Sequence, residues 1–219
     1  MLKKVAVLVS LFFVYHCVLA QEEIDYTQFS LEQLLELEVT TAGKTLQKVI
    51  DVPTSIVVIS AEEINAYGYR TIAQILQNTP GFYVSYDRNY TYAGVRGFAR
   101  PGDYNNRILL LLNGHPLNEW VFSSSYISYE FPVSIDLIDH IEVVYGPGSS
   151  LYGSNALFAV VNIVTKSGEF SDLKAKTGSF KFWGGDFIFS KKGLTINGRG
   201  FYSGGQDLYF SEFDAPKTN

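Results

Sequence analysis

Short apolar runs recur between residues 56 and 164 and are separated by glycine, proline and asparagine, a pattern typical of buried strands. One of these runs is followed directly by Asn113 and Gly114, a strong signal for a tight hairpin. The predicted strands cover residues 56–59, 82–86, 93–97, 107–112, 141–145 and 160–164.

Two capping boxes interrupt the strand pattern. Ser60 and Thr71 are each followed three residues later by Glu or Gln, which predicts the start of a helix. We expect the first helix to end at Tyr67, before a glycine, and the second at about Asn78, shortly before a Pro-Gly pair. Mixed strands and two capped helices predict a compact α+β unit over residues 45–168.

After residue 168 the pattern changes to alternation. Between residues 194 and 200, Leu, Ile and Gly alternate with Thr, Asn and Arg, and Phe alternates with Ser and Lys over residues 179–182. This period of two predicts a sheet with one apolar face. The pattern fits the wall of a membrane barrel and an ordinary sandwich equally well.

The first 20 residues have the parts of a secretory signal peptide: two lysines, an apolar run and small residues before Gln21. The alternative is a membrane anchor, but a spanning helix needs roughly 20 apolar residues and this run is shorter. We therefore expect cleavage and export. Further on, leucines at helical spacing over residues 30–38 predict a short amphipathic helix.

Charge and cysteine content exclude several classes of function. The chain has 17 Lys and Arg against 22 Asp and Glu, a net charge of −5, so we expect no nucleic-acid partner. The one cysteine, Cys17, lies in the leader, which argues against a disulfide framework or a multi-cysteine metal site. Neither His115 nor His140 has a catalytic constellation around it. We expect a binding or structural protein with no metal and no cofactor, rather than an enzyme.

Three segments carry a more specific signal: AGVRGF at residues 93–98, NRILLLLNG at 106–114, and DLIDHIEVVYGPGSSLYGSNALFAVVNIVTK at 136–166. In this order and spacing they closely resemble the plug domain of TonB-dependent outer-membrane receptors, over roughly residues 30–168. Tyr145 departs from the family pattern, which usually has Arg or Lys before Gly-Pro-Gly.

The resemblance implies a domain order and a set of structural residues. The order is a signal peptide (1–20), an N-terminal segment (21–44), a plug (45–168) and the first strands of a transmembrane antiparallel β-barrel (169–219), which in the family has about 22 strands. Arg96 is similar to the family's buried plug arginine, a charge that needs a partner. The structural motif residues are Arg96, Gly97, Asn113, Gly114, Gly146, Pro147, Gly148, Tyr152, Gly153 and Asn155.

The family's plug loops bind a cargo, usually a ferric siderophore or cobalamin, which the protein imports. In this chain, residues 87–92, 99–105 and 120–129 offer aromatic rings and guanidinium groups that suit an anionic or aromatic chelate. For any single tyrosine, the alternative role of filling a hydrated interface explains the residue equally well. The candidate ligand-binding residues are Arg88, Tyr90, Tyr92, Arg100, Tyr104 and Trp120.

The resemblance also implies partners. The family carries a TonB box, an extended segment that adds a strand to the sheet of the periplasmic energiser TonB, which works with an inner-membrane complex. The candidate box is Glu38, Val39, Thr40, Thr41 and Ala42. Outer-membrane lipid would surround the barrel strands.

The length limits what this chain does alone. About 22 spanning strands need on the order of 200–240 residues, far more than follow residue 168. We therefore expect a piece of a longer gene product or a truncated one. A plug-like periplasmic binding protein without transport activity is the alternative, and a secreted enzyme with a β-rich tail lacks a nucleophile or base that we can name.

Overall fold

The computed structural model describes residues 55–205, except Pro101 and Ser154, together with the backbone of four short strands outside that range. Those four are β1 (Glu38–Val39) paired with β2 (Gln47–Lys48), and β13 (Leu208–Phe210) paired with β14 (Ala215–Thr218). The predicted signal peptide, and the amphipathic helix apart from its last residue, lie outside the described residues.

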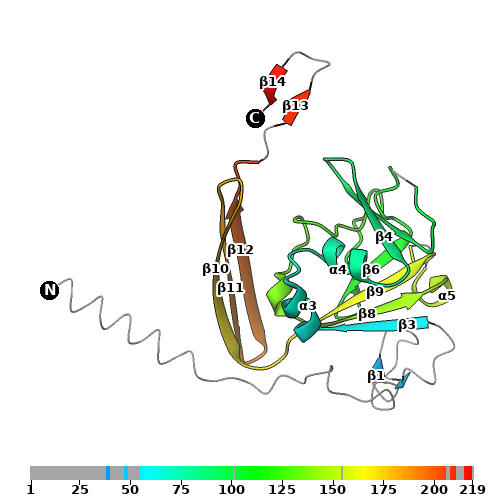
Figure 1. The fold of residues 1–219 in the computed structure, drawn as a ribbon. Coiled ribbons are helices and arrows are strands. Elements are labelled where there is room, and N and C mark those ends of the chain that lie inside the picture. The colour runs from blue at the N-terminus through cyan, green and yellow to red at the C-terminus, as the bar shows by residue number, and fades with distance from the viewer. Residues whose placement is uncertain are drawn as a thin grey trace.

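A five-stranded mixed sheet forms the centre of the α+β unit (Figure 1). Its order is β3 (Ser55–Ser60), β8 (Ile138–Tyr145), β9 (Ala159–Thr165), β6 (Ile108–Leu112) and β7 (His115–Pro116). Strands β6 and β9 run parallel and the other neighbours run antiparallel, which confirms the expected mixed sheet. Asn113 and Gly114 form the β6–β7 turn with positive φ at both positions, as the hairpin signal predicted.

Both predicted helices begin at their predicted caps. Helix α3 (Ala61–Tyr67) starts where the hydroxyl of Ser60 accepts a hydrogen bond from the amide of Glu63, and it ends at Gly68 in the left-handed conformation. Helix α4 (Ile72–Asn78) starts where Thr71 accepts one from the amide of Gln74. None of the helices in the described part of the chain is long and apolar enough to cross a membrane.

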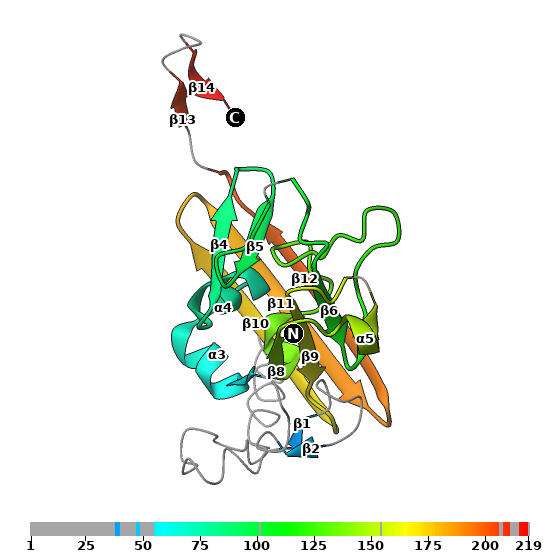
Figure 2. The same ribbon diagram turned by 90° about the vertical axis from the view of Figure 1, so that its right-hand side faces the viewer.

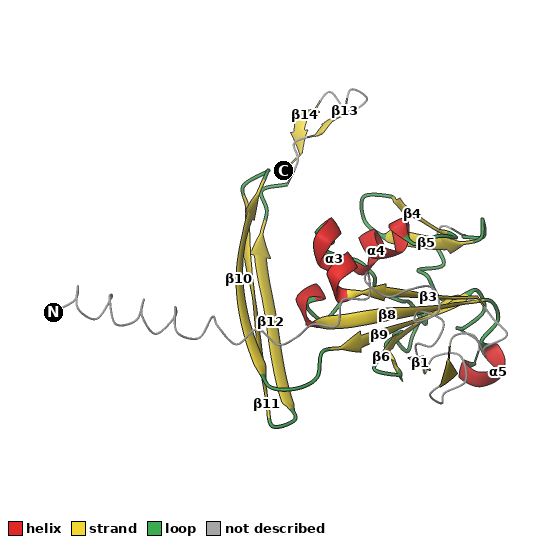
Figure 3. Cartoon of the chain, turned by 60° about the horizontal axis from the view of Figure 1, so that its bottom comes forward, coloured by secondary structure: helices red, strands yellow, loops and turns green. Residues whose placement is uncertain are grey.

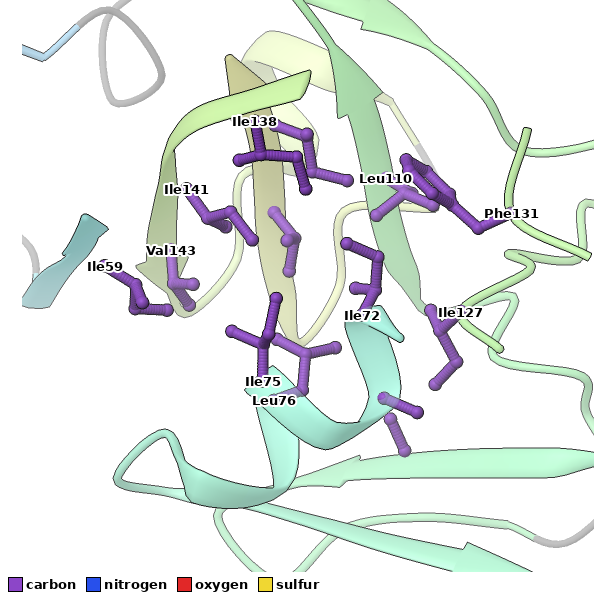
Figure 4. Packing of buried hydrophobic residues seen from close by; sticks show 14 of the residues in the cluster. Ile59, Ile72, Ile75, Leu76, Leu110, Ile127, Phe131, Ile138, Ile141 and Val143 are labelled. Carbon is purple, nitrogen blue, oxygen red and sulfur yellow. The ribbon is translucent and has the colours of Figure 1, made fainter. Parts of the chain in front are cut away.

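The main core lies where α4, the central sheet and residues 127–133 meet (Figure 4). The sheet is covered on its other face as well, by a smaller cluster that includes Leu109, Leu111 and Val160. Because strand β6 is buried on both faces, its run of leucines is continuous instead of alternating. The fully buried side chains include Ile72, Ile75, Leu76, Leu110, Ile127, Phe131, Ile138 and Ile141.

A separate hairpin of β4 (Phe82–Tyr86) and β5 (Thr91–Val95) stands above α4 at the upper edge of the unit in the views of Figures 1 and 2. The structure corrects the predicted strand 93–97: β5 begins two residues earlier and ends at Val95. Arg96 and Gly97 both have positive φ, so they form a turn instead of continuing the strand. Two short helices complete the unit, the 3-10 helix η3 (Ile135–Leu137) and helix α5 (Ser149–Tyr152).

The last part of the chain forms an antiparallel three-stranded sheet of β10 (Phe170–Gly178), β11 (Phe182–Lys191) and β12 (Leu194–Tyr202). The predicted alternation over 179–182 is wrong, because Phe180 and Lys181 have positive φ and form the β10–β11 turn. The alternation in β12 is confirmed: Thr195, Asn197 and Arg199 share the face that meets the α+β unit.

The two faces of this sheet differ sharply. The inner face carries charged and polar side chains and lies beside one end of strands β8 and β9 (Figure 3). The outer face is apolar and exposed, and consists of Leu173, Trp183, Phe187, Phe189, Leu194, Ile196 and Tyr202. A sandwich would bury its apolar face, whereas a barrel wall turns that face outward, so the arrangement matches the barrel wall.

Candidate functional site

Four aromatic rings form a cluster at the turn end of the β4–β5 hairpin and on the loops beside it. The rings of Tyr90 and Tyr104 meet edge to face with centroids 5.0 Å apart. The ring centroid of Tyr104 lies 6.3 Å from that of Tyr92 and 6.4 Å from that of Phe122. Tyr92 is buried, whereas the other three rings are partly or largely exposed. The cluster therefore presents three exposed rings that pack around the buried ring of Tyr92.

The turn between β4 and β5 is held by Asp87. Its carboxylate accepts hydrogen bonds from the amides of Asn89 (2.8 Å) and Tyr90 (2.7 Å) and from the hydroxyl of Tyr92 (2.9 Å). The amide bonds lower the pKa of Asp87, so the carboxylate stays charged. Burial and the bond to Asp87 raise the pKa of Tyr92 to about 12, which keeps its hydroxyl a donor. Tyr92, expected in an irregular segment, lies within β5.

Asn105 connects this hairpin to the neighbouring loops. Its side-chain oxygen accepts a hydrogen bond from the amide of Ala93 (2.7 Å), and its amide nitrogen donates to the carbonyls of Thr91 (2.9 Å) and Ser125 (3.1 Å). The side chain is buried, and its backbone has a φ of 62°. Sequence reasoning missed this residue; the one available signal is that Asn tolerates the left-handed region better than most residues.

The loop that carries Phe122 is shaped by its own polar side chains. Asn118 accepts a hydrogen bond from the amide of Leu110 and donates to two carbonyls. Glu119 accepts from the amides of Val121 and Phe122 and from Ser124. Desolvation acts to raise the pKa of Glu119, but these amide bonds outweigh it and lower the pKa. The loop thus holds Trp120 at its tip, where the ring is fully exposed.

The structure brings together three of the six ligand-binding candidates, Tyr90, Tyr92 and Tyr104. Trp120 belongs to the Phe122 loop and has no ring contact with the cluster among the described residues. Arg88 and Arg100 are both exposed on loops near the cluster, Arg88 with a φ of 79° in the β4–β5 turn. Phe122, which was not named as a candidate, is the fourth ring.

The motif arginine differs from its expected environment. Arg96 is exposed among the described residues instead of buried, and its guanidinium carbon lies 5.3 Å from the ring centroid of Tyr145. Tyr145, the residue that departs from the family pattern, is buried; its ring packs on Phe82 and its hydroxyl donates to the carbonyl of Pro80. An aromatic ring therefore contacts the guanidinium at the position where the family has a second cation.

The Gly-Pro-Gly motif forms a compact turn around helix α5. The amides of Gly146 and Gly148 donate to the carbonyls of Phe158 and Ala156, both at 2.9 Å. A Cβ at Gly148 would lie 3.0 Å from a side-chain carbon of Val160, so a larger residue there would require Val160 to shift. Gly153 has a φ of 88°, which glycine adopts without strain. Pro147 is exposed, and Tyr152 and Asn155 are partly buried.

A polar network on the sheet was not predicted. Nδ1 of His140 lies 2.6 Å from Asp139, and its Nε2 lies 3.6 Å from the buried Glu142. The side chain of Asn162 donates to Glu142 (3.1 Å) and accepts from the amide of Gly114 (2.9 Å). Burial acts to lower the pKa of His140, but the bonds to the two carboxyl groups outweigh it and raise the pKa to about 9. The network joins β8 and β9 to the β6–β7 turn.

Of the TonB-box candidates, Glu38 and Val39 form strand β1, which pairs with Lys48 and Gln47. This replaces the end of the predicted amphipathic helix with a strand. Thr40, Thr41 and Ala42 lie outside the described residues.

Comparison with known proteins gives consistent similarities. The family described as TonB-dependent Receptor Plug Domain matches residues 48–160. The vitamin B12 transporter BtuB of Vibrio vulnificus (strain CMCP6) is 30% identical over 152 residues, which are 68% of this chain and 24% of the transporter. The iron-regulated outer membrane virulence protein of Vibrio cholerae serotype O1 is 31% identical over 135 residues, or 60% of this chain and 20% of that protein.

Among solved structures, the pyoverdine outer membrane receptor FpvA from Pseudomonas aeruginosa PAO1 has the same fold. The TM-score is 0.56 at 22% identity, over 75% of this chain and 24% of the receptor. This chain thus spans about a quarter or less of the length of these proteins. Because the family match covers more than half of the chain, with strands β3, β6, β7 and β8, both capped helices and the aromatic cluster, this chain belongs to the TonB-dependent receptor plug domain family.

Proposed function

We propose that this chain is the N-terminal part of a TonB-dependent outer-membrane receptor that binds and imports a metal chelate, such as a ferric siderophore, or a vitamin such as cobalamin. The observation that carries the proposal is the cluster of Tyr90, Tyr92, Tyr104 and Phe122 on the loops of the plug. Its exposed rings offer stacking surfaces for a large, partly aromatic ligand. The similarity to a vitamin B12 transporter and a pyoverdine receptor supports both ligand classes.

The rings are held in place before any ligand arrives, which favours binding over a merely space-filling role. Asp87 fixes the hairpin turn, Asn105 fixes the loop of Tyr104, and Glu119 fixes the loop of Phe122. Side chains that are already ordered lose little conformational entropy on binding.

In this proposal the remaining segments have the roles that the sequence predicted. Residues 1–20 direct export and are removed, residues 21–44 carry the TonB box, and residues 45–168 form the plug. Residues from 169 onward begin the barrel, whose apolar outer face contacts outer-membrane lipid. TonB would recruit the segment from Glu38 to Ala42 by strand addition and supply the energy for import.

The alternative, a free plug-like periplasmic binding protein, is less well supported. Seven large apolar side chains on the outer face of β10–β12 are at least 46% exposed. A water-soluble protein seldom leaves such a continuous apolar face uncovered.

The proposal is tested by equilibrium dialysis of the chain in detergent micelles against cyanocobalamin and ferric pyoverdine. We expect one of the two probes to bind, and the double variant Tyr90→Ala/Phe122→Ala to bind about tenfold more weakly, which corresponds to about 1.4 kcal/mol. Tyr67→Ala is the matched control, because Tyr67 is similarly exposed but lies on helix α3, outside the cluster. Binding of neither probe, or equal losses in both variants, would contradict the proposal.

A further inference from the structure

A small cavity lies between the connection from α3 to α4 and the inner face of β11 and β12. Its volume is about 30 Å³, and it is lined by Arg70 and Tyr129 on one side and by Arg199 and Phe201 of β12 on the other. One water molecule needs roughly 10–15 Å³ of such space. The cavity therefore has room for two or three water molecules, or for one carboxylate group.

Arg70 brings a guanidinium to this cavity without a carboxylate beside it. The guanidinium carbon lies 5.8 Å from the ring centroid of Phe182, and the backbone amide donates to the side chain of Gln74 at 2.7 Å. Among the described residues, the side chain of Arg70 makes no hydrogen bond and no ion pair. A guanidinium has five N–H donors, so those of Arg70 are available to a ligand.

Arg199 also lacks a carboxylate partner in the described part of the chain. Its Nη2 donates to the carbonyls of Tyr129 (2.7 Å) and Phe131 (2.9 Å). Asp186 is its direct neighbour on β11, but that carboxylate is held by Lys176 at 2.6 Å instead. Two neutral carbonyls do not balance a full positive charge, so Arg199 keeps the capacity to bind an anion.

The charge around the cavity is positive. The lining includes three cationic side chains, Arg70, Lys176 and Arg199, and one acidic one, Asp186. Lys176 and its neighbour Lys174 contact Asp186 and Asp136, which balances these two acids. The two guanidiniums are left uncompensated, and a guanidinium binds a carboxylate through two parallel hydrogen bonds.

Aromatic rings stand beside the two guanidiniums. The ring of Phe201 packs on Tyr129, with centroids 5.2 Å apart, and on Phe182, with centroids 6.1 Å apart. Phe201 is 48% exposed and Tyr129 is 47% exposed, so both rings are packed on one side and open to solvent on the other. An exposed aromatic face favours a ligand that carries its own ring.

We propose that this cavity is a binding site for an aromatic carboxylate. The carboxylate enters between Arg70 and Arg199, and the ring of the ligand packs on Phe201. This inference does not depend on the ligand of the Tyr90 cluster, because none of the four rings of that cluster lines the cavity.

A titration of the full chain in detergent micelles with benzoate tests the proposal. The chain has six arginines, so the Nε–H groups of ¹⁵N-labelled arginine give a spectrum with few signals. We expect saturable shifts at Arg70 and Arg199 and no comparable shifts at Arg88 and Arg100. Benzamide has nearly the same shape without the charge and should leave all of these signals in place. Equal shifts at Arg88 and Arg100, or equal shifts with benzamide, would overturn the proposal.

Variants separate the roles of charge and ring. Arg70→Gln should weaken benzoate binding, read at the Arg199 signal, by about tenfold or more. Arg100→Gln is the matched control and should leave the affinity unchanged, because Arg100 is exposed on a loop and does not line the cavity. If Arg70→Gln does not fold, Arg70→Lys, which loses the paired donors, should weaken binding in the same direction.

Acetate tests the contribution of the ring. We expect benzoate to bind about tenfold more tightly than acetate to the unsubstituted chain, and Phe201→Leu to reduce that preference. Unchanged benzoate affinity in the Arg70 variant would overturn the proposed site. Equal affinities of the unsubstituted chain for acetate and benzoate would overturn the assignment of an aromatic ligand.

Discussion

The guanidinium of Arg96 lies over the ring of Tyr145, 5.3 Å from its centroid, at the edge of the plug core. The amide of Arg96 also donates to the carbonyl of Gly81 at 2.7 Å, and the hydroxyl of Tyr145 donates to the carbonyl of the preceding Pro80. The two residues therefore fasten the turn after β5 to the start of β4. Tyr145, which precedes Gly-Pro-Gly, holds these two segments together by packing its ring against Arg96 and by its hydrogen bond to Pro80.

We predict that Tyr145→Phe lowers the free energy of unfolding by about 1 kcal/mol, because it removes one hydrogen bond and keeps the ring. Tyr145→Ala should cost about 3–5 kcal/mol, because it leaves a cavity beside Phe82. Arg96→Gln should cost about 0.5–1 kcal/mol. Urea unfolding in detergent micelles measures all three. Arg100→Gln, at an exposed site, is the control and should change stability by less than about 0.5 kcal/mol. A Tyr145→Phe cost as large as that of Tyr145→Ala would contradict this account.

The His140 network predicts a loss of stability at alkaline pH. The folded-state pKa of about 9 is raised above the ordinary value of 6.5, so the folded state binds the proton more tightly than the unfolded state. This contribution is complete below pH 6.5 and is lost as the pH rises through 9. We expect the free energy of unfolding to fall by on the order of 1–3 kcal/mol over this window. His140→Gln should flatten the profile, and an equally steep profile in that variant would argue against the network as its cause.

Asn105→Ala is expected to destabilise the plug and to weaken ligand binding. The substitution leaves the buried amide of Ala93 and two carbonyls without their partner, at a cost of about 2–4 kcal/mol. Because Asn105 positions the loop that carries Tyr104, we expect weaker binding of cyanocobalamin or ferric pyoverdine, whichever of the two the unsubstituted chain binds, together with lower stability. Asn106→Ala, one residue further on, is the control for urea unfolding and dialysis. Similar losses of stability and of binding in Asn105→Ala and Asn106→Ala would contradict the assignment of Asn105 as the residue that positions the loop.

Two glycines of β12 give a matched test of the outer face. A Cβ at Gly198 would lie 2.2 Å from the ring of Phe187 on the neighbouring strand, whereas a Cβ at Gly200 meets nothing within 4 Å. We expect Gly198→Ala to displace the half-exposed ring of Phe187 from its rotamer, at a cost of about 0.5–1.5 kcal/mol. Gly200→Ala should be close to neutral. Urea unfolding of both variants measures the difference, and equal costs would mean that the ring of Phe187 does not depend on the space at Gly198.

Helix ends and tight turns were predictable because their signals are local. The caps at Ser60 and Thr71 bond to amides three residues away, so a short stretch of sequence contains the whole interaction. The same holds for the turn at Asn113 and Gly114. The boundaries of β5 were not predictable. The turn at Arg96 is stabilised by a hydrogen bond from its amide to the carbonyl of Gly81, which precedes β4 and is not a sequence neighbour of the turn.

For the candidate site, the sequence predicted which types of residue line a binding surface, but not which of those residues lie together. Tyrosines and arginines in irregular segments indicated a binding surface, and three of the six candidates do meet. Their grouping depends on Asn105, which bonds to residues 12 to 20 positions away. A pattern of neighbouring residues does not contain contacts of that range, so Phe122 joined the cluster without a sequence signal.

The sequence by itself determined the α+β class, both helices, the strand segments and the family, because capping, turn geometry and motif spacing act over short distances. Only the tertiary structure decided the strand order, the partner of Arg96 and which face of β10–β12 is turned outward. Those features depend on pairing and burial between distant segments. A strand with one apolar face can bury that face or expose it. Here the charged face of β10 and β11 contacts Ser134 and Asp136 of the plug, so the apolar face is turned outward.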